Sequence, residues 1–196
     1  MRMILASNNQ KKLTEMRAIC MDLGIELLSL GEAGIVSEVD ETGTSYEQNA
    51  ALKARAACDL SGLPAVADDS GLEVFALGGR PGIRSARYGG EGFDDRDRYL
   101  LLLDEMRDVP DGERGGRFVS AICCSFPDGR EITARGECAG VILREPAGVG
   151  GFGYDPVFYI EAEHMTMAEL ASERKNQISH RARALAQFRK ALTEML

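Results

Sequence analysis

The segment from Phe118 to Phe126 limits the possible folds more than any other, because it is apolar on both of its faces. A strand with this pattern belongs in the centre of a sheet that is covered on both sides. The turn sequence Pro-Asp-Gly-Arg at residues 127–130 follows directly and predicts a hairpin into a second strand that begins at Glu131. We therefore expect a sheet with an antiparallel pair near the middle of the chain.

Helical segments alternate with short apolar segments along the rest of the chain. A predicted strand at residues 3–7 leads into a polar loop and then into a helix whose apolar stripe begins at Leu13. Thr44 and Glu47 have the spacing of a capping box and predict a second helix that ends near Gly62. A third helix is predicted from Asp94 to Met106, because acidic residues occupy its first turn.

The order of these elements predicts an α/β fold with a mixed sheet. A short strand is expected to end at Ile160, and Ser179 is a plausible N-cap for a long C-terminal helix. We find no linker that would divide the chain into independently folding halves, so we expect a single domain over residues 1–196.

Composition excludes several classes of function. A content of 44% hydrophobic and 28% charged residues is that of an ordinary globular protein. The net charge of −8 argues against general binding to nucleic acid or anionic membranes, and no apolar run approaches the ~20 residues that a membrane span needs. No secretory signal is evident, and the five cysteines, an odd number without a C-x-x-C pair, predict reduced thiols in the cytoplasm.

The stretch Ala-Val-Ala-Asp-Asp-Ser-Gly at residues 65–71 carries the most unusual polar residues, because an apolar strand runs directly into two carboxylates. Asp, Ser and Gly are common turn residues, so a plain polar turn is one interpretation. The other is a metal or base site at the end of a strand, where open α/β sheets bind their ligands. Taken alone, the stretch favours the turn.

Other polar stretches supply features that a turn does not explain. Lys12 lies at the start of a predicted helix, and Asn49 and Lys53 are four residues apart and share one helix face. A second acidic pair, Asp40-Glu41, precedes the same helix, and the Gly-rich loop 148–154 carries aromatic residues that could stack on a base. Carboxylates suit Mg²⁺ and lysines suit phosphates, so together these features indicate a nucleoside triphosphate site, although each could also be a solvated loop or helix end.

Motifs along essentially the whole chain resemble the inosine triphosphate pyrophosphatase family, which hydrolyses deaminated purine nucleoside triphosphates. The matching segments are I-L-A-S-N-N-Q-K-K at 4–12, E-T-G and N-A-x-x-K-A within 41–54, A-D-D-S-G-L-E-V at 67–74, L-G-G-R-P-G-I-R-S-A-R-Y at 77–88, R-E-P-A-G-x-G-G-F-G-Y-D-P-V-F at 144–158 and K-N-Q-I-S-H-R-A-R-A-L at 175–185. The resemblance implies a single elongated α/β domain of two lobes around a mixed, partly antiparallel sheet with flanking helices, a nucleotide cleft between the lobes, and a homodimer.

The resemblance also implies the chemistry. Asp69 would be the general base, Glu41, Asp69 and Asp68 would bind Mg²⁺, and the substrate would be ITP, dITP or XTP, cleaved to the monophosphate and pyrophosphate. The expected partner is the nucleotide alone, with no nucleic acid and no membrane, and the expected location is the cytoplasm. The residues expected to bind substrate are Ser7, Asn8, Asn9, Gln10, Lys11, Lys12, Lys53, Ser70, Phe152, Gly153, Tyr154, Asp155, Lys175, His180 and Arg181.

Three positions depart from the family pattern. Lys11 stands where the first loop usually has glycine, Phe75 stands where aspartate is frequent, and Ala182 stands where glycine is usual. Two alternatives remain open at this stage. A Maf-type pyrophosphatase also begins with an L-A-S loop, but its S-P-R-R continuation is absent here. A nucleotide-binding regulator that has lost hydrolysis is the other alternative, and the presence of Asp69 and Glu41 argues against it.

Overall fold

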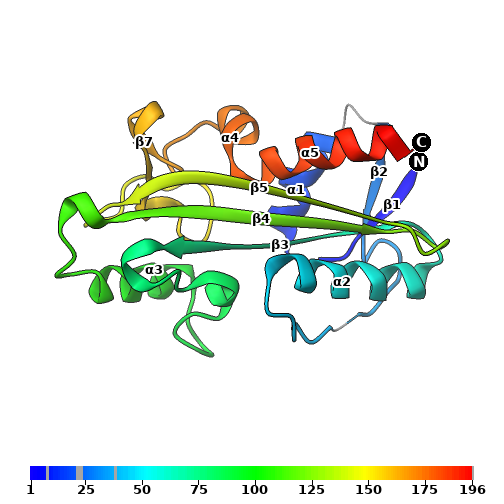
Figure 1. Cartoon of the computed structure of the whole chain (residues 1–196), viewed down its shortest axis with the longest axis horizontal. Helices are drawn as coiled ribbons and strands as arrows, with labels where there is room; N and C mark the ends of the chain where they lie inside the picture. Colours follow the sequence, from blue (N-terminus) through cyan, green and yellow to red (C-terminus); the bar gives the residue numbers. More distant parts are fainter. Residues whose placement is uncertain (8, 21–23, 38, 196) are drawn as a thin grey trace. The chain divides into compact units, whose positions relative to one another are not determined.

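The computed structural model describes residues 1–7, 9–20, 24–37 and 39–195, and within them the strands form one seven-stranded sheet (Figure 1). The strands are β1 (Arg2–Leu5), β2 (Glu26–Ser29), β3 (Ala65–Val74), β4 (Gly115–Ser125), β5 (Glu131–Ile142), β6 (Phe158–Ile160) and β7 (Met165–Thr166). Their order across the sheet is β2-β1-β3-β4-β5-β6-β7. The α-helices are α1 (Gln10–Cys20), α2 (Tyr46–Ser61), α3 (Asp95–Glu105), α4 (Ser172–Ile178) and α5 (His180–Met195). Short 3-10 helices are η2 (Phe75–Leu77), η3 (Gly82–Arg87), η4 (Asp111–Glu113), η5 (Asp155–Val157) and η6 (Glu161–Glu163).

The sheet is mixed, as predicted. Strand β1 pairs in parallel with β2 and with β3, with Ile4 opposite Leu28 on one side and Ala65 on the other. Strand β6 pairs antiparallel with both β5 and β7. The predicted hairpin is also present, because the Phe126 N–H donates to the Arg130 carbonyl where β4 turns into β5. The α/β fold class with a mixed sheet is therefore confirmed.

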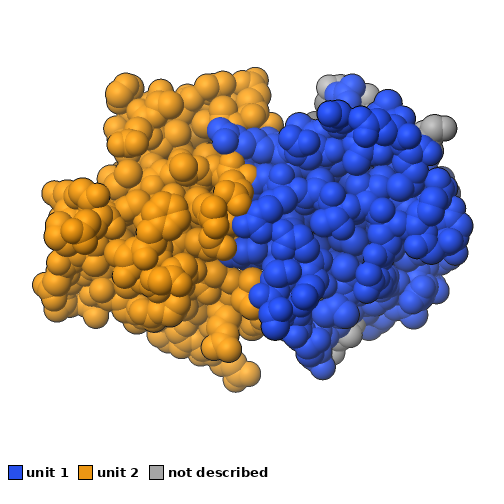
Figure 2. Space-filling view, in the orientation of Figure 1, with its two compact units in different colours: residues 1–69, 120–136, 179–196 blue, residues 70–119, 137–178 orange. Residues whose placement is uncertain are grey.

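The chain divides into two compact units, coloured separately in Figure 2. Unit 1 comprises residues 1–69, 120–136 and 179–196, and unit 2 comprises residues 70–119 and 137–178. The strands β3, β4 and β5 each supply residues to both units. The expectation of a single domain over the whole chain stays a prediction.

Unit 1 is a sheet with a core on each face, which explains why its central strands are apolar on both sides. Met3 and Leu5 join one core with residues of α1 and α5, whereas Ile4 between them joins the other core with residues of α2. Along β4, Ile122 belongs to the first of these cores and Cys123 to the second. Helices α1 and α5 thus cover one face of this part of the sheet and α2 covers the other (Figure 1).

Unit 2 has one apolar core, in which Phe118 and Phe158 pack with their ring centroids 4.4 Å apart. Leu102 and Met106, from α3 and the residue after it, complete this core against strand residues. Each unit therefore buries its own apolar side chains. In the described part of the chain, no helix combines the length and apolar character that a membrane span needs.

Most predicted helix ends are confirmed, with one correction. Asp94 caps α3 and Ser179 caps α5, where its hydroxyl accepts from the Ala182 N–H. Helix α2 ends at Gly62 as predicted, but its N-cap is Ser45 and not Thr44. Ser45 Oγ accepts from the N–H of Gln48, whose side chain reaches back to Thr44. Because Ser45 and Gln48 have the same spacing as Thr44 and Glu47, the sequence pattern alone could not choose between the two registers.

Candidate active site

The two carboxylates Asp68 and Asp69 lie within strand β3 and not at its end, which corrects the prediction from sequence. Strand β3 continues through Ser70 and Gly71 to Val74. Asp68 is 1% exposed and Asp69 is 6% exposed. A strand can keep buried carboxylates in its interior only where other elements bring partners to them.

Asp68 is held by three partners from distant parts of unit 1. Its Oδ2 accepts Lys12 Nζ at 2.9 Å and the Arg181 guanidinium at 3.3 Å, and its Oδ1 accepts the hydroxyl of Ser120. Burial alone would raise the pKa of the Asp68 carboxyl, but the charges of Lys12 and Arg181 and the Ser120 hydrogen bond hold it well below its usual range. Asp68 is therefore ionised throughout the neutral range.

Asp69 points to a different set of partners, because neighbouring residues of a strand face opposite sides of the sheet. Lys53 Nζ donates to Asp69 Oδ1 at 3.1 Å, and the Asn49 amide donates to Asp69 Oδ2 at 3.3 Å. Asn49 and Lys53 thus meet one carboxylate from the shared face of α2 that their spacing predicted. Burial raises the pKa of Asp69, and Glu41 adds to this rise against the opposing charge of Lys53, so the net shift is upward.

Glu41 approaches the same lysine from the loop before α2. Its Oε1 lies 2.8 Å from Lys53 Nζ. The loop passes so close to α2 that a Cβ on Gly43 would lie 2.6 Å from Asn49 Oδ1, which instead accepts the Gly43 N–H. Burial alone would lower the pKa of Lys53, but the carboxylates of Asp69 and Glu41 raise it above its ordinary value. We name the set of Lys12, Glu41, Asn49, Lys53, Asp68, Asp69, Ser120 and Arg181 the aspartate–lysine cluster.

The donor set of this cluster fits a Mg²⁺ ion that shares its coordination with a ligand. Glu41 and Asp69 converge on one cation, the Lys53 ammonium, and both supply the oxygen atoms that Mg²⁺ prefers. The described residues contain no group of three or more His, Cys, Asp or Glu side chains arranged to hold a metal ion. Mg²⁺ usually takes only one or two protein carboxylates and completes its shell with water and phosphate oxygens, so two carboxylates are sufficient.

The first loop, residues 7–12, leads into α1 as predicted. The side chain of Asn9 accepts the N–H groups of Lys11 and Lys12 and so caps the helix. Lys11 lies inside α1, a conformation open to any residue, so its replacement of the family glycine does not distort the helix start. Ser7 Oγ accepts from the Asn9 N–H, and Gln10 is exposed at the first turn. Asn8, also expected to bind substrate, lies outside the described residues.

A second polar cluster lies in unit 2, around the loop before η5. The carboxylate of Asp155 accepts Lys175 Nζ and the Phe152 N–H on the same oxygen, each at 2.8 Å. Lys175 Nζ also lies 4.9 Å from the centre of the Phe152 ring. Gly151, with φ of +72°, permits this turn, because a Cβ there would lie 2.0 Å from Asp155 Oδ2.

Phe152 and Tyr154, the two aromatic residues expected to bind the base, lie in different environments. Phe152 is half-buried and presents a ring beside a cation. Tyr154 is 4% exposed, packs in the core of unit 2, and donates its hydroxyl to the Ser85 carbonyl. Gly153 donates its N–H to Asp95. Phe152 is thus the partly exposed aromatic of this loop, and Tyr154 is a core residue.

The remaining expected residues also divide between the units. His180 and Arg181 begin α5 in unit 1, where both are buried and Arg181 joins the aspartate–lysine cluster. Lys175 and Ser70 belong to unit 2. Ser120 was missed by sequence reasoning, although a serine inside an apolar central strand was a signal that could have found it.

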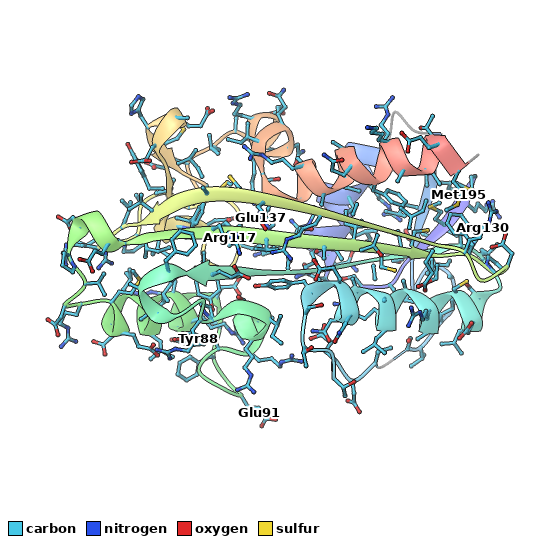
Figure 3. All side chains as sticks on the ribbon, viewed as in Figure 1. Tyr88, Glu91, Arg117, Arg130, Glu137 and Met195 are labelled. Carbon is cyan, nitrogen blue, oxygen red and sulfur yellow. The ribbon has the colours of Figure 1, made fainter. Side chains whose placement is uncertain are left out.

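Ion pairs elsewhere on the molecule differ from those of the cluster in their exposure. Figure 3 shows Arg117 beside Glu137 on β4 and β5, with side chains 38% and 37% exposed. Arg130, on the turn between these strands, pairs with Asp128 at about half exposure. In contrast, the Arg181 and Asp68 side chains are 1% and 0% exposed. Exposed pairs contribute little to stability, whereas a buried charge network costs stability unless its charges are paired and hydrogen-bonded.

The aspartate–lysine cluster can perform three chemical tasks. Asp69, with its raised pKa, can accept a proton from water near neutral pH more readily than an ordinary aspartate. Lys12 and Lys53 can hold phosphate oxygens, and Glu41 with Asp69 can share a divalent cation. Proton acceptance, phosphate binding and a cation site together suit hydrolysis of a phosphoanhydride.

Comparisons with known proteins identify the relatives of this chain. The sequence model described as the Ham1 family matches residues 3–191. A dITP/XTP pyrophosphatase of Mycobacterium bovis is 48% identical over 197 residues, covering 99% of this chain and 96% of that protein. The structure of a HAM1 protein from Coxiella burnetii has a TM-score of 0.90 with 40% identity and covers 99% of both chains. The structure of a dITP/XTP pyrophosphatase from Mycobacterium abscessus has a TM-score of 0.78 with 46% identity and covers 96% of this chain and 98% of that one.

Proposed function

The chain belongs to the Ham1 family, and from this membership and the aspartate–lysine cluster we propose that it is a nucleoside triphosphate pyrophosphatase. Its substrates are non-standard purine nucleotides, dITP, ITP and XTP, and its products are the nucleoside monophosphate and pyrophosphate. Such an activity removes deaminated purines from the pool that supplies DNA and RNA synthesis.

The observation that carries the proposal is the environment of Asp69. Its carboxylate is buried, its pKa is raised, and Lys53, Asn49 and Glu41 surround it. As general base, Asp69 takes a proton from water while the water oxygen bonds to the α-phosphorus and the bond from that phosphorus to the α–β bridging oxygen breaks. The bridging oxygen leaves with pyrophosphate, whose developing charge Lys12 and Lys53 stabilise.

We assign Mg²⁺ binding to Glu41 and Asp69. A bound Mg²⁺ supplies positive charge that neutralises the triphosphate and assists the attack of water. Asp68 was also expected to bind the metal, but both of its oxygens already accept hydrogen bonds from Ser120, Lys12 and Arg181. Its proposed role is to hold Lys12 in place.

The remaining residues are proposed to bind the nucleotide in two groups. Phe152 stacks on the purine, and the donors of His180 and Arg181 recognise the oxygen at C6 of hypoxanthine or xanthine. Adenine has an amino donor at C6, and opposing donors cost about 1–3 kcal/mol for each unmatched group. The residues proposed to bind phosphates are Ser7, Asn8, Asn9, Gln10, Lys11, Lys12, Lys53 and Ser70, and those proposed to bind the base are Phe152, Gly153, Asp155, Lys175, His180 and Arg181. Tyr154, which was also expected to bind the base, is proposed to support this loop from the core of unit 2.

The test is pyrophosphate release from a panel of nucleoside triphosphates with Mg²⁺. We expect ITP, dITP and XTP to exceed ATP in kcat/KM by about 10²–10⁴-fold, as for a site that matches a polar group of its substrate. Arg181→Ala should shrink this difference. Equal kcat/KM for ATP and ITP would reject the specificity, and binding of ITP without pyrophosphate release would favour a non-hydrolysing regulator.

We further propose that the protein acts in the cytoplasm as a homodimer. Four buried cysteines, Cys58, Cys123, Cys124 and Cys138, form no disulfide, which suits a reducing compartment. The side chain of Cys20 lies outside the described part of the chain. The dimer rests on the family resemblance, and sedimentation of the purified protein tests it.

A further inference from the structure

Ser120 is a polar residue in the interior of β4 that the proposed mechanism does not use. It is 0% exposed, and its neighbours Val119, Ala121 and Ile122 are equally buried and apolar. Its hydroxyl donates to Asp68 Oδ1 from 52 residues away in the sequence. A buried hydroxyl among apolar neighbours costs stability unless it is hydrogen-bonded, and this one bonds to an ionised group.

Asp68 is the point at which both phosphate-binding lysines meet. Its Oδ2 accepts Lys12 Nζ at 2.9 Å, and its main-chain carbonyl accepts Lys53 Nζ at 3.2 Å and Lys12 Nζ at 3.5 Å. The carbonyl is fixed by the strand, but the carboxylate is attached through a torsion with a broad energy profile. Arg181 holds Oδ2 and Ser120 holds Oδ1, so the direction of Oδ2, and with it the position of Lys12 Nζ, depends on both of these contacts.

We propose that Ser120 is a positioning residue for catalysis, which acts through Asp68 on Lys12. By holding Oδ1, the Ser120 hydroxyl turns Oδ2 toward Lys12, and a long flexible lysine side chain is kept at one place before substrate arrives. The contribution of Lys12 to transition-state stabilisation depends on such pre-organisation, because a group that must first be ordered stabilises charge less. The inference deepens the proposed pyrophosphatase function and rests on it for its kinetic consequences.

The test compares Ser120→Ala with a matched control, Ser125→Ala. Ser125 is on the same strand, is 4% exposed, and also donates to a carboxylate, at 2.7 Å, but that carboxylate belongs to Glu131, which pairs with Arg55. We expect Ser120→Ala to lower kcat/KM for ITP by about 10-fold or more, as for loss of a hydrogen bond to a charged group. Ser125→Ala should stay within about twofold of the unchanged protein.

A double-mutant cycle with Lys12→Ala distinguishes positioning from a structural role. If Ser120 acts through Lys12, Ser120→Ala should have little further effect once Lys12 is absent. The inference is overturned if Ser120→Ala lowers kcat/KM by the same factor in both backgrounds, if it has no effect, or if Ser125→Ala has an equal effect. If Ser120→Ala does not fold, Ser120→Cys replaces it, because a thiol is a weaker hydrogen-bond donor than a hydroxyl. The effect of Ser120→Cys on kcat/KM is then compared between the unchanged protein and Lys12→Ala in the same way.

Binding of inorganic tripolyphosphate, measured by calorimetry without Mg²⁺, separates this inference from the proposed function. Ser120→Ala should weaken this binding at least about threefold in the unchanged background and not in the Lys12→Ala background. If the protein hydrolyses no nucleotide but this difference holds, the proposed function fails and the positioning of Lys12 by Ser120 stands. If hydrolysis is found but neither kcat/KM nor this binding responds to Ser120→Ala, only the positioning is rejected.

Discussion

Replacing Asp68 with asparagine removes a negative charge that two cations and a hydroxyl share inside unit 1. The asparagine side chain has nearly the same shape, so the cavity is unchanged. Its amide can satisfy Ser120 through its oxygen, but its NH₂ group then faces Lys12 and Arg181, which are themselves donors. The variant therefore isolates the electrostatic contribution of the carboxylate from its packing.

The magnitude follows from the burial of the partners. The Arg181 side chain is 1% exposed and is shielded from solvent in the absence of a ligand, whereas that of Lys12 is 16% exposed and can turn toward solvent. Breaking a buried pair lowers the free energy of unfolding by about 3–5 kcal/mol. Because Lys12 can turn toward solvent, we expect Asp68→Asn to lower it by an amount near the lower end of this range, about 3 kcal/mol. Asp128→Asn is the control, because it makes the same chemical change at an exposed pair with Arg130, where no measurable loss is expected.

The effect has a defined dependence on pH. The pKa of Asp68 is lowered in the folded protein, because the charges of Lys12 and Arg181 and the Ser120 hydrogen bond outweigh its burial. The carboxylate therefore stabilises the fold fully above its unfolded pKa of about 4, and this contribution is lost as the pH falls below that value toward the folded pKa. The difference in unfolding free energy between the unchanged protein and Asp68→Asn should be constant from pH 5 to pH 8 (about one to four pH units above that pKa) and shrink below about pH 4.

Guanidinium denaturation, followed by tyrosine fluorescence and circular dichroism, measures these differences. The reasoning is refuted if Asp68→Asn costs less than about 1 kcal/mol at pH 7, the range of an exposed pair, or if Asp128→Asn costs as much as Asp68→Asn. A difference that grows as the pH falls below 4 would show that the sign of the pKa shift is wrong.

Three further predictions concern the proposed activity. Asp69→Asn keeps the shape of the side chain but removes the proposed base, so pyrophosphate release from ITP should slow about 10²–10⁴-fold with folding retained; near-normal turnover would reject the assignment. Lys53→Ala should weaken inhibition by a non-hydrolysable ITP analogue more than inhibition by IMP, which lacks the β- and γ-phosphates, and equal losses would place the lysine elsewhere. Gly151→Ala puts a Cβ against the carboxylate of Asp155, so KM for ITP should rise and the unfolding free energy should fall by about 1–3 kcal/mol; an unchanged KM would separate this loop from substrate binding.

Local pattern in the sequence was sufficient for much of the architecture. An apolar stripe located α1, and capping or first-turn residues located α2, α3 and α5. The apolar segment at 118–126 indicated a central strand, and both faces of that strand are covered. The spacing of Asn49 and Lys53 placed both side chains on one face of α2, where they meet Asp69. These features depend on neighbours within a few residues of one another, and such relations are present in the sequence itself.

The burial and the pairing of Asp68 and Asp69 depend on the tertiary structure. From sequence, the two adjacent carboxylates predicted either a polar turn or a site at the end of a strand. The structure keeps both inside β3, since Lys12, Ser120 and Arg181 reach Asp68 from 56, 52 and 113 residues away along the chain. Opposite charges stabilise one another when they are close in space, and the sequence alone does not show which residues are close. Only the tertiary structure therefore determines that these carboxylates are buried and paired.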